Sequence, residues 1–340
     1  MIVQQALQQL INRRDLTQTD MHAAMMAVMT GGATPAQIGA FLVALRMKGE
    51  TVAEITAAAQ VMRELSSKVT LHVKRKHLVD TCGTGGSGIP LFNISTASAF
   101  VVACAGGFVA KHGNRSVTSK SGSADLLEAA GVNLALTPTQ VTKCVDEIGV
   151  GFMFAVNHHS AMKHAINPRR EIAVRTIFNV LGPLTNPADA PNQVLGVFDK
   201  NLVRPLAEVL KNLGSEHVLV VHSQDGLDEI SLAAPTFVAE LKDGEIHEYS
   251  ITPESLGLKS QSLDSLYIDD AKQSLALVKT ALTDNHSAAA DIVALNAGAA
   301  IYAANLCANL QQGVDMARDI LGIGIAWEKL QEFAVFTQHV

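Results

Sequence analysis

The chain has 340 residues, of which 48% are hydrophobic and 17% charged, so a sizeable core is available and global disorder is excluded. At roughly 100–200 residues per domain, this length predicts two domains or one large α/β unit. The net charge of −6, with no basic tail, argues against a dedicated nucleic-acid-binding protein but leaves a local basic pocket open.

The first 66 residues contain helical patterns only. They do not open with a basic stretch followed by an apolar core, so we expect no signal peptide. Thr34-Pro35 provides a cap and a first-turn proline, and Thr51-x-x-Glu54 is a capping box. Helices are therefore expected at residues 2–11 and 20–29, after Thr34 and after Thr51.

After Lys68, short β-type runs alternate with helical runs, which is the pattern of parallel strands joined by crossover helices. Apolar runs such as 97–108 are too short and too rich in glycine and alanine to span a bilayer. Strands are expected at residues 78–81, 107–112, 132–136, 151–156, 193–198, 217–222, 236–241 and 245–250. Helices are expected at residues 95–106, 123–131, 137–149, 271–281 and 288–307.

The cysteines stand alone in the sequence, at positions Cys82, Cys104, Cys144 and Cys307. No CxxC pair is present, so neither a zinc site nor a disulfide framework is indicated. Their simplest interpretation is as small buried hydrophobic residues, in keeping with a reducing cytoplasm.

A glycine-rich loop, DTCGTGGSGIPLFNIST, follows the first expected strand. Gly83-x-Gly85-x-x-Gly88 matches the dinucleotide fingerprint, but no helix begins within the glycine turn. Lys111 stands where that fold would place an acidic ribose-binding residue, and a cation there favours phosphate. The loop is therefore either a tight turn without a ligand or a phosphate site at a helix N-terminus near Ser95, which could equally be a simple N-cap.

A second loop, KHGNRSVTSKSGSADLLEAAG, also leads from an expected strand into a helix. Its cations Lys111, Arg115 and Lys120 would suit a polyphosphate, although a solvated charged loop is the simpler alternative. The hydroxyl groups among them belong to Ser116, Thr118, Ser119, Ser121 and Ser123. Loops after successive strands of a parallel sheet lie side by side at its carboxyl edge, where α/β proteins bind ligands.

An acid pair, Asp228-Glu229, follows another strand-like run. Such pairs are usually solvated, but magnesium takes one or two carboxylates together with substrate phosphate oxygens. Phosphate loops, a magnesium site and no Walker lysine together indicate a phosphorylated sugar or a pyrophosphate ester as ligand.

A fourth segment, residues 157–188, contains NPRREIAVRTIFNVLGPLTNPA. Asn167-Pro168 predicts a helix start and Gly182-Pro183 its end. Arg169 would then lie in the first turn, where the helix dipole disfavours a cation, and this suggests that it holds a carboxylate. A surface arginine is the alternative. His158 and His159 are candidates to line the same pocket.

Together, in this order, GTGG…NIST, KHGNRSV, SKSGSADLLE, RTIFNVLGPLTNPA and the acid pair resemble the anthranilate phosphoribosyltransferase family over essentially the whole chain. The resemblance implies a small all-helical domain and a large α/β domain with a mostly parallel central sheet, similar to nucleoside phosphorylases. We expect these domains at residues 1–70 and 71–340, with helices near 167–185 joining the first. The resemblance also implies a homodimer through the helical domain, and an association with anthranilate synthase stays open. The lone cysteines and the expected lack of a signal peptide predict a cytoplasmic location.

By matching motif, the resemblance also assigns site residues. Lys111, Asn114 and Arg169 are expected to be catalytic. Contacts to phosphoribosyl pyrophosphate (PRPP) are expected from Gly83, Gly86, Ser87, Asn93, Ser95, Thr96, Lys111, Arg115, Ser119 and Ser123. Contacts to anthranilate are expected from Gly83, Asn114, His159, Arg169 and Pro183, and Mg²⁺ is expected at Ser95, Asp228 and Glu229.

The chain departs from the family within the glycine loop. The family usually has an aspartate where this chain has Ser87, and a threonine or serine where it has Leu91. Ser87 removes a negative charge beside the expected pyrophosphate, which should change metal dependence or PRPP affinity. Ser87 is the one feature that favours a catalytically weakened relative acting as a binding protein, and the other motifs argue against that alternative. A pyrimidine nucleoside phosphorylase of the same fold is a second alternative. A nicotinamide-dependent dehydrogenase is disfavoured by Lys111.

Overall fold

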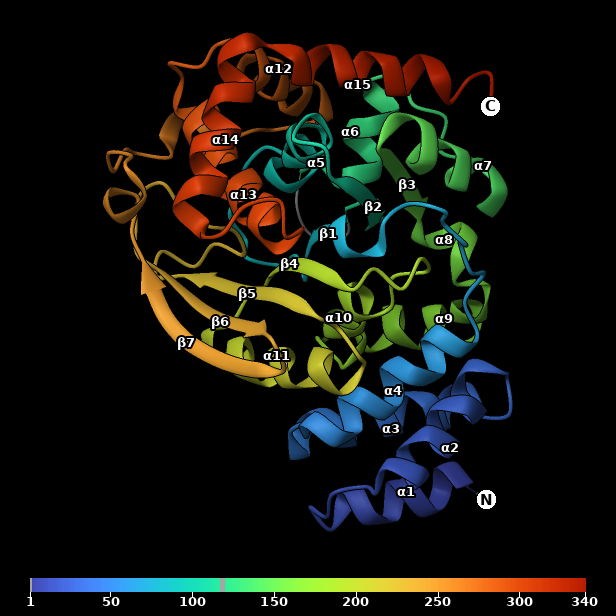
Figure 1. Cartoon of the computed structure of the whole chain (residues 1–340). Coiled ribbons are helices and arrows are strands. Elements are labelled where there is room, and N and C mark those ends of the chain that lie inside the picture. Colours follow the sequence, from blue (N-terminus) through green and yellow to red (C-terminus); the bar gives the residue numbers. More distant parts are fainter. Residues whose placement is uncertain (1, 117–119) are drawn as a thin grey trace.

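The computed structural model describes residues 2–116 and 120–340 and begins with a bundle of helices (Figure 1). The Thr34 side chain accepts a hydrogen bond from the Gln37 backbone at 3.3 Å, which confirms the expected cap. Thr51 caps in the same way. The second helix begins two residues earlier than expected because Thr17 is its cap. The helices are α1 (Ile2–Ile11), α2 (Gln18–Met29), α3 (Pro35–Lys48) and α4 (Val52–Glu64).

A seven-stranded sheet forms the centre of the described part of the chain, in the order β3-β2-β1-β4-β5-β6-β7. The strands from β3 to β5 are parallel, and β6 and β7 are antiparallel to their neighbours, so the sheet is mostly parallel as expected. Their bounds are β1 (Leu78–Gly83), β2 (Phe108–Gly113), β3 (Val150–Phe154), β4 (Asn192–Gly196), β5 (His217–Ser223), β6 (Thr236–Lys242) and β7 (Glu245–Ile251).

Helices cover the two faces of this sheet (Figure 1). One face carries α5 (Ile94–Cys104) and α13 (Ala288–Ala303), with α12 (Ala271–Thr283), α14 (Leu310–Ile323) and α15 (Ile325–Phe336) packed around them. The other face carries α11 (Val203–Asn212), which also packs on α4. The shorter helices are α6 (Ser123–Ala129), α7 (Pro138–Lys143), α8 (Ala155–His158), α9 (Lys163–Ile172) and α10 (Phe178–Leu181).

Strand β5 shows how the sheet separates two hydrophobic cores. Leu219 and Val221 face the core beneath α5 and α13, whereas Val218 and Val220 face the core beneath α11. This alternation is the period-two pattern of a strand buried on both faces. The second core continues into the helical bundle and includes its fully buried Phe41. Within the described residues no helix is long and apolar enough to cross a membrane, and the cysteines are free thiols.

The strand expected at residues 132–136 is wrong, because this segment is irregular. Its backbone donors find partners outside any sheet. The Val132 N–H donates to the Leu127 carbonyl at 2.9 Å, and the Asn133 N–H donates to the Thr337 hydroxyl at 3.1 Å. Val132 and Leu136 are buried in the hydrophobic core, whereas Leu134 is half-buried against it and Ala135 is exposed.

The helix start expected at Asn167-Pro168 is also wrong. Helix α9 begins at Lys163 and contains Pro168, because the preceding turn packs against α2 and α3 with Ala165 fully buried. Arg169 therefore lies in the last turn, where the helix dipole favours a cation, and its position is no sign of strain. The helix ends at Ala173, which has a φ of 49°.

Candidate active site

The motif-bearing loops meet at the carboxyl edge of the sheet. Strands β1, β2, β3 and β5 run parallel, and the glycine loop, the second loop, residues 157–188 and the acid pair follow their carboxyl ends in that order. The Thr84 N–H donates to the Gly196 carbonyl at 2.9 Å, which joins the glycine loop to the end of β4. A Cβ atom on Gly83 would lie 2.9 Å from the Asp228 carboxylate, so the acid pair sits directly against the glycine loop.

The glycine loop combines a tight turn with a close approach. Gly85, Gly86 and Gly88 have φ values of 65°, 81° and 79°, which glycine adopts without strain. Gly196 has a different reason for lacking a side chain, since a Cβ there would lie 1.6 Å from the Asp228 carbonyl oxygen. The acid pair therefore fits against the glycine loop and β4 because Gly83 and Gly196 carry no side chain.

Lys111 is buried at the centre of these loops, with 2% exposure. Its ammonium group donates to the Thr81 carbonyl and, at 3.3 Å, to the Ser95 hydroxyl. Burial lowers the pKa of Lys111, and the negative charges of Asp80 and Glu229 oppose that shift. The structure thus brings Lys111, Ser95 and the acid pair into one cluster.

Two buried residues near this cluster, Asp80 and Asn186, were not predicted from the sequence. Asp80 is buried within β1 and accepts hydrogen bonds from the Asn186 side chain at 2.7 Å and the His112 backbone at 3.2 Å. Burial raises the pKa of Asp80 to about 6, although the charge of Lys111 and these hydrogen bonds lower it. A carboxylate inside a short β-type run was the sequence signal that could have identified Asp80.

The acid pair has the electrostatics of a cation site. Burial and the neighbouring charge of Asp228 raise the pKa of Glu229 to about 8, against the opposing charge of Lys111 and hydrogen bonds from Ser95. Two adjacent carboxylates with a serine hydroxyl form a set of hard oxygen donors, which suits Mg²⁺. No group of three or more histidine, cysteine or acidic side chains suitable for a metal occurs in the described residues, so a bound ion would need further oxygen atoms from a substrate.

The two described parts of the second loop contact each other. The Ser123 N-terminal end of α6 meets Asn114, whose carbonyl accepts hydrogen bonds from the Ala124 backbone at 3.2 Å and the Ser123 hydroxyl at 3.4 Å. The Arg115 guanidinium pairs with Asp125 at 3.0 Å and Glu128 at 2.8 Å, so its charge is balanced within the loop. Ser119 lies outside the described residues.

Asn93 links the two loops. Its amide donates to the Ser121 carbonyl at 3.1 Å, and its side-chain oxygen accepts from the hydroxyls of Ser121 at 2.8 Å and Ser274 at 2.7 Å. Asn93 is also the residue at the cap position of α5, in place of the expected Ser95. Thr96 points into the core, 1% exposed, and its hydroxyl has no partner among the described residues.

The residues expected to receive anthranilate lie on the segments that follow β3. His159 is buried with its ring edge against His112, 5.0 Å between centroids, and burial with the neighbouring His158 lowers its pKa to about 4. It is therefore a neutral ring at neutral pH. The Arg169 guanidinium lies 4.9 Å over the Phe178 ring, and Pro183 is buried nearby in the chain. The contacts of the described residues do not join Arg169 to Gly83 or Asn114.

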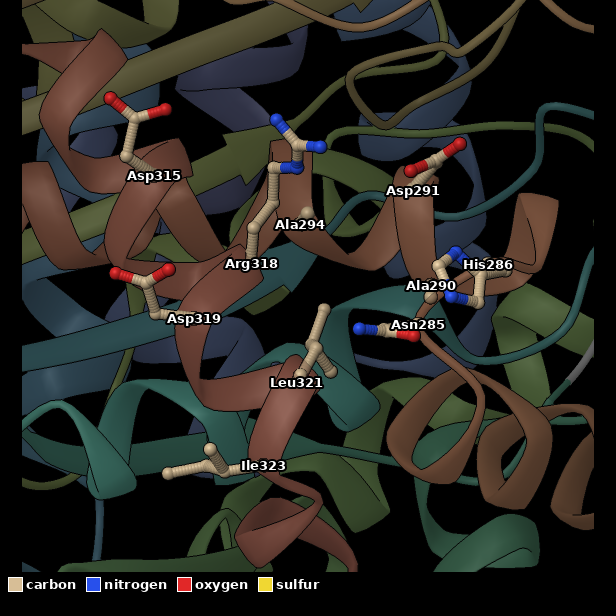
Figure 2. A pocket seen from close by; sticks show the side chains of 11 residues that line it. Asn285, His286, Ala290, Asp291, Ala294, Asp315, Arg318, Asp319, Leu321 and Ile323 are labelled. Carbon is tan, nitrogen blue, oxygen red and sulfur yellow. The ribbon is translucent and has the colours of Figure 1, made fainter.

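A separate hollow of about 760 Å³ opens between α13 and α14. Figure 2 shows its charged lining, including Arg318, Asp291, Asp315 and Asp319. None of the described lining residues belongs to the glycine loop, the second loop or the acid pair. The hollow is therefore distinct from the cluster around Lys111.

Comparisons with protein families divide the chain in the same way as its helices and sheet. Residues 4–66 match the family model described as the helical bundle domain of the glycosyl transferase family, and residues 75–327 match that of its a/b domain. The chain is thus an enzyme of this glycosyl transferase class.

Relatives that match over nearly their whole length identify the family within this class. The chain is 63% identical to an anthranilate phosphoribosyltransferase of Marinomonas sp. (strain MWYL1), covering 99% of this chain and 98% of the relative. It is 62% identical to one of Cellvibrio japonicus (strain Ueda107), over all of both chains. The chain therefore belongs to the anthranilate phosphoribosyltransferase family.

Solved structures agree with this placement. The anthranilate phosphoribosyltransferase of Thermus thermophilus superposes with a TM-score of 0.92 at 42% identity, covering 98% of this chain and 99% of that one. The enzyme of Saccharomyces cerevisiae in complex with PRPP and Mg superposes with a TM-score of 0.88 at 25% identity, covering 99% and 98%. The expected two-part α/β fold is confirmed.

Proposed function

We propose that this chain transfers the phosphoribosyl group of PRPP to the amine of anthranilate in a magnesium-dependent reaction that releases pyrophosphate, within tryptophan biosynthesis. The observation that carries this proposal is the cluster of Lys111, Ser95, Asp228 and Glu229 beside the glycine loop. Membership of the family and the PRPP and Mg complex of the yeast relative support it.

The donor set of the acid pair fits Mg²⁺. Glu229 has a raised pKa because it is buried and another carboxylate lies beside it, and a divalent cation would relieve this repulsion. Ser95, Asp228 and Glu229 would hold the ion together with phosphate oxygen atoms of the substrate. When bound, Mg²⁺ supplies positive charge that stabilises the leaving pyrophosphate.

The chain's own groups bind and orient the two substrates. Backbone N–H groups of the glycine loop and the N-terminus of α5 would bind anionic phosphate, and the Lys111 ammonium beside Ser95 would add to this attraction. Gly86, Ser87, Asn93, Thr96, Ser119 and Ser123 complete the proposed contacts to PRPP. Arg115 would exchange Asp125 and Glu128 for phosphate when PRPP binds.

Anthranilate is held by its carboxylate. We assign this contact to Arg169, since burial lowers its pKa without removing its charge and a guanidinium matches a carboxylate with two parallel bonds. Gly83, Asn114, His159 and Pro183 would line the path. The aromatic amine needs no strong base before attack, so its position behind the anomeric carbon supplies much of the rate. Displacement inverts that carbon from α to β through an oxocarbenium-like state.

The expected domain division also stays a prediction. We place it near residue 70, with residues 167–185 joining the helical bundle, because α9 packs on α2 and α3. A homodimer, a cytoplasmic location and an association with anthranilate synthase are predictions of the same kind. Ser87, which lacks the negative charge of the family's aspartate, would change magnesium dependence or PRPP affinity.

Loss of anthranilate fluorescence after addition of PRPP and magnesium tests the proposal. We expect a loss that requires both additions and that Asp228→Asn/Glu229→Gln abolishes. Full activity of this double variant would exclude the acid pair as the metal site. No loss at any magnesium concentration would leave the binding-protein alternative, and phosphate-dependent cleavage of a pyrimidine nucleoside would favour the phosphorylase.

A further inference from the structure

Arg175 reaches the glycine loop from the segment between α9 and α10. Its guanidinium donates from Nη2 to the Gly86 carbonyl at 2.6 Å. The same nitrogen would lie 3.2 Å from a Cβ atom placed on Gly86. The left-handed turn at Ala173, with a φ of 49°, ends α9 and directs the chain toward this contact. Arg175 thus connects the helices that pack on the bundle with the loop expected to bind phosphate.

Phe198 supports the guanidinium from the other side. The guanidinium carbon of Arg175 lies 4.2 Å from the centre of the Phe198 ring, within the range of a cation–π interaction. The Phe198 backbone N–H donates to the Thr84 hydroxyl at 3.1 Å. Arg175 and Phe198 are therefore both hydrogen-bonded to the glycine loop, at Gly86 and at Thr84 respectively.

The charge of Arg175 is available to a ligand. Lys111 is buried and donates to protein oxygen atoms, and Arg115 is paired with two carboxylates. Arg175 is exposed, and no carboxylate among the described residues forms an ion pair with it. A guanidinium has five N–H groups, so the bond to Gly86 leaves donors free.

We propose that Arg175 is a further PRPP-binding residue, which holds the glycine loop through the Gly86 carbonyl and donates its free N–H groups to the pyrophosphate. This inference rests on the proposed function. A planar guanidinium matches phosphate oxygen atoms with two parallel bonds, which a lysine does not reproduce. The neutral Ser87, next to Gly86, brings no carboxylate that would compete for the arginine.

Steady-state kinetics of Arg175 variants test this assignment. Arg175→Ala and Arg175→Gln should raise the KM for PRPP about tenfold or more, as expected for losing a charged hydrogen bond, with the KM for anthranilate unchanged. Arg175→Lys should fall between these variants and the unmodified chain. Arg204→Gln removes an exposed guanidinium that pairs with Glu208 and Glu248, and this matched control should leave both constants unchanged.

Two results would overturn the assignment. One is an unchanged KM for PRPP in Arg175→Ala. The other is full recovery in Arg175→Gln, because glutamine can still donate to Gly86 and recovery would show that only loop position matters. If the unmodified chain transfers nothing, calorimetric binding of magnesium pyrophosphate replaces kinetics. Weaker binding by Arg175→Gln would then support the phosphate contact although the proposed function had failed, and equal binding would refute it.

Discussion

Replacing Gly196 by alanine should displace the acid pair and reduce turnover strongly. The new Cβ would lie 1.6 Å from the Asp228 carbonyl oxygen, and ordinary contact begins at 3.4 Å, so the two backbones must separate by about 1.8 Å. A misplacement of about 1 Å in an active site can cost on the order of a hundredfold in rate. We therefore expect kcat/KM for PRPP to fall by about a hundredfold or more in Gly196→Ala.

The assay is anthranilate fluorescence at varied PRPP and magnesium, with a melting curve for each variant. Overpacking of this size costs typically about 1–3 kcal/mol, so the variant should fold with a lowered Tm. Gly39→Ala is the matched control, because its Cβ would meet the Ile172 side chain at an ordinary 3.6 Å. A folded Gly196→Ala variant with unchanged kcat/KM and magnesium dependence would refute the claim that this close approach positions the acid pair.

Further substitutions test the anthranilate contact and the stability of the fold. Arg169→Ala should raise the KM for anthranilate far more than the KM for PRPP, and equal effects would argue against its role. Glu54→Ala should destabilise the protein by about 1–3 kcal/mol in denaturant unfolding, because the fully buried carboxylate accepts from the Leu16 N–H at 2.9 Å and is one of two partners of the Lys48 ammonium, with Asp15 as the other; a loss under about 0.5 kcal/mol would contradict this. Burial would raise the pKa of Glu240, but hydrogen bonds from His217 and two tyrosines outweigh it and lower the pKa to about 2. Since the unfolded carboxyl titrates near 4.5, this stabilisation is complete above that pH and is lost as the pH falls toward 2. The Tm gap between the protein and Glu240→Gln should therefore shrink from about pH 6 to about pH 3, and a constant gap would count against it.

Local signals predicted most of the elements. The capping residues Thr34 and Thr51 fixed helix starts because they bond to backbone groups three residues away. Short β-type runs between helical runs predicted the parallel strands, because this pattern also lies within a few consecutive residues. The apolar run at 132–136 was misleading because its backbone N–H groups bond to the end of the preceding helix and to the Thr337 side chain, which is about 200 residues away, and not to a strand.

The individual loops of the site were predictable from their own motifs, but the contacts between the loops were not. The sequence indicated that Lys111 and the acid pair follow strands, but the 3.3 Å contact of Lys111 with Ser95 depends on the fold. Pro168 suggested a helix start and placed Arg169 in the wrong turn, since burial of Ala165 extends α9 backward. The motif RTIFNVLGPLTNPA begins at Arg175, but no local pattern indicated its bond to Gly86, which joins residues 89 positions apart.

The most direct test of the central claim is the stoichiometry of the reaction. Pyrophosphate release and anthranilate consumption should be measured together, in mixtures that contain or lack PRPP and magnesium. The proposed function predicts one pyrophosphate for each anthranilate consumed, a product whose mass is that of phosphoribosyl anthranilate, and no reaction when either addition is omitted. Pyrophosphate release without loss of anthranilate, or no release at all, would contradict it.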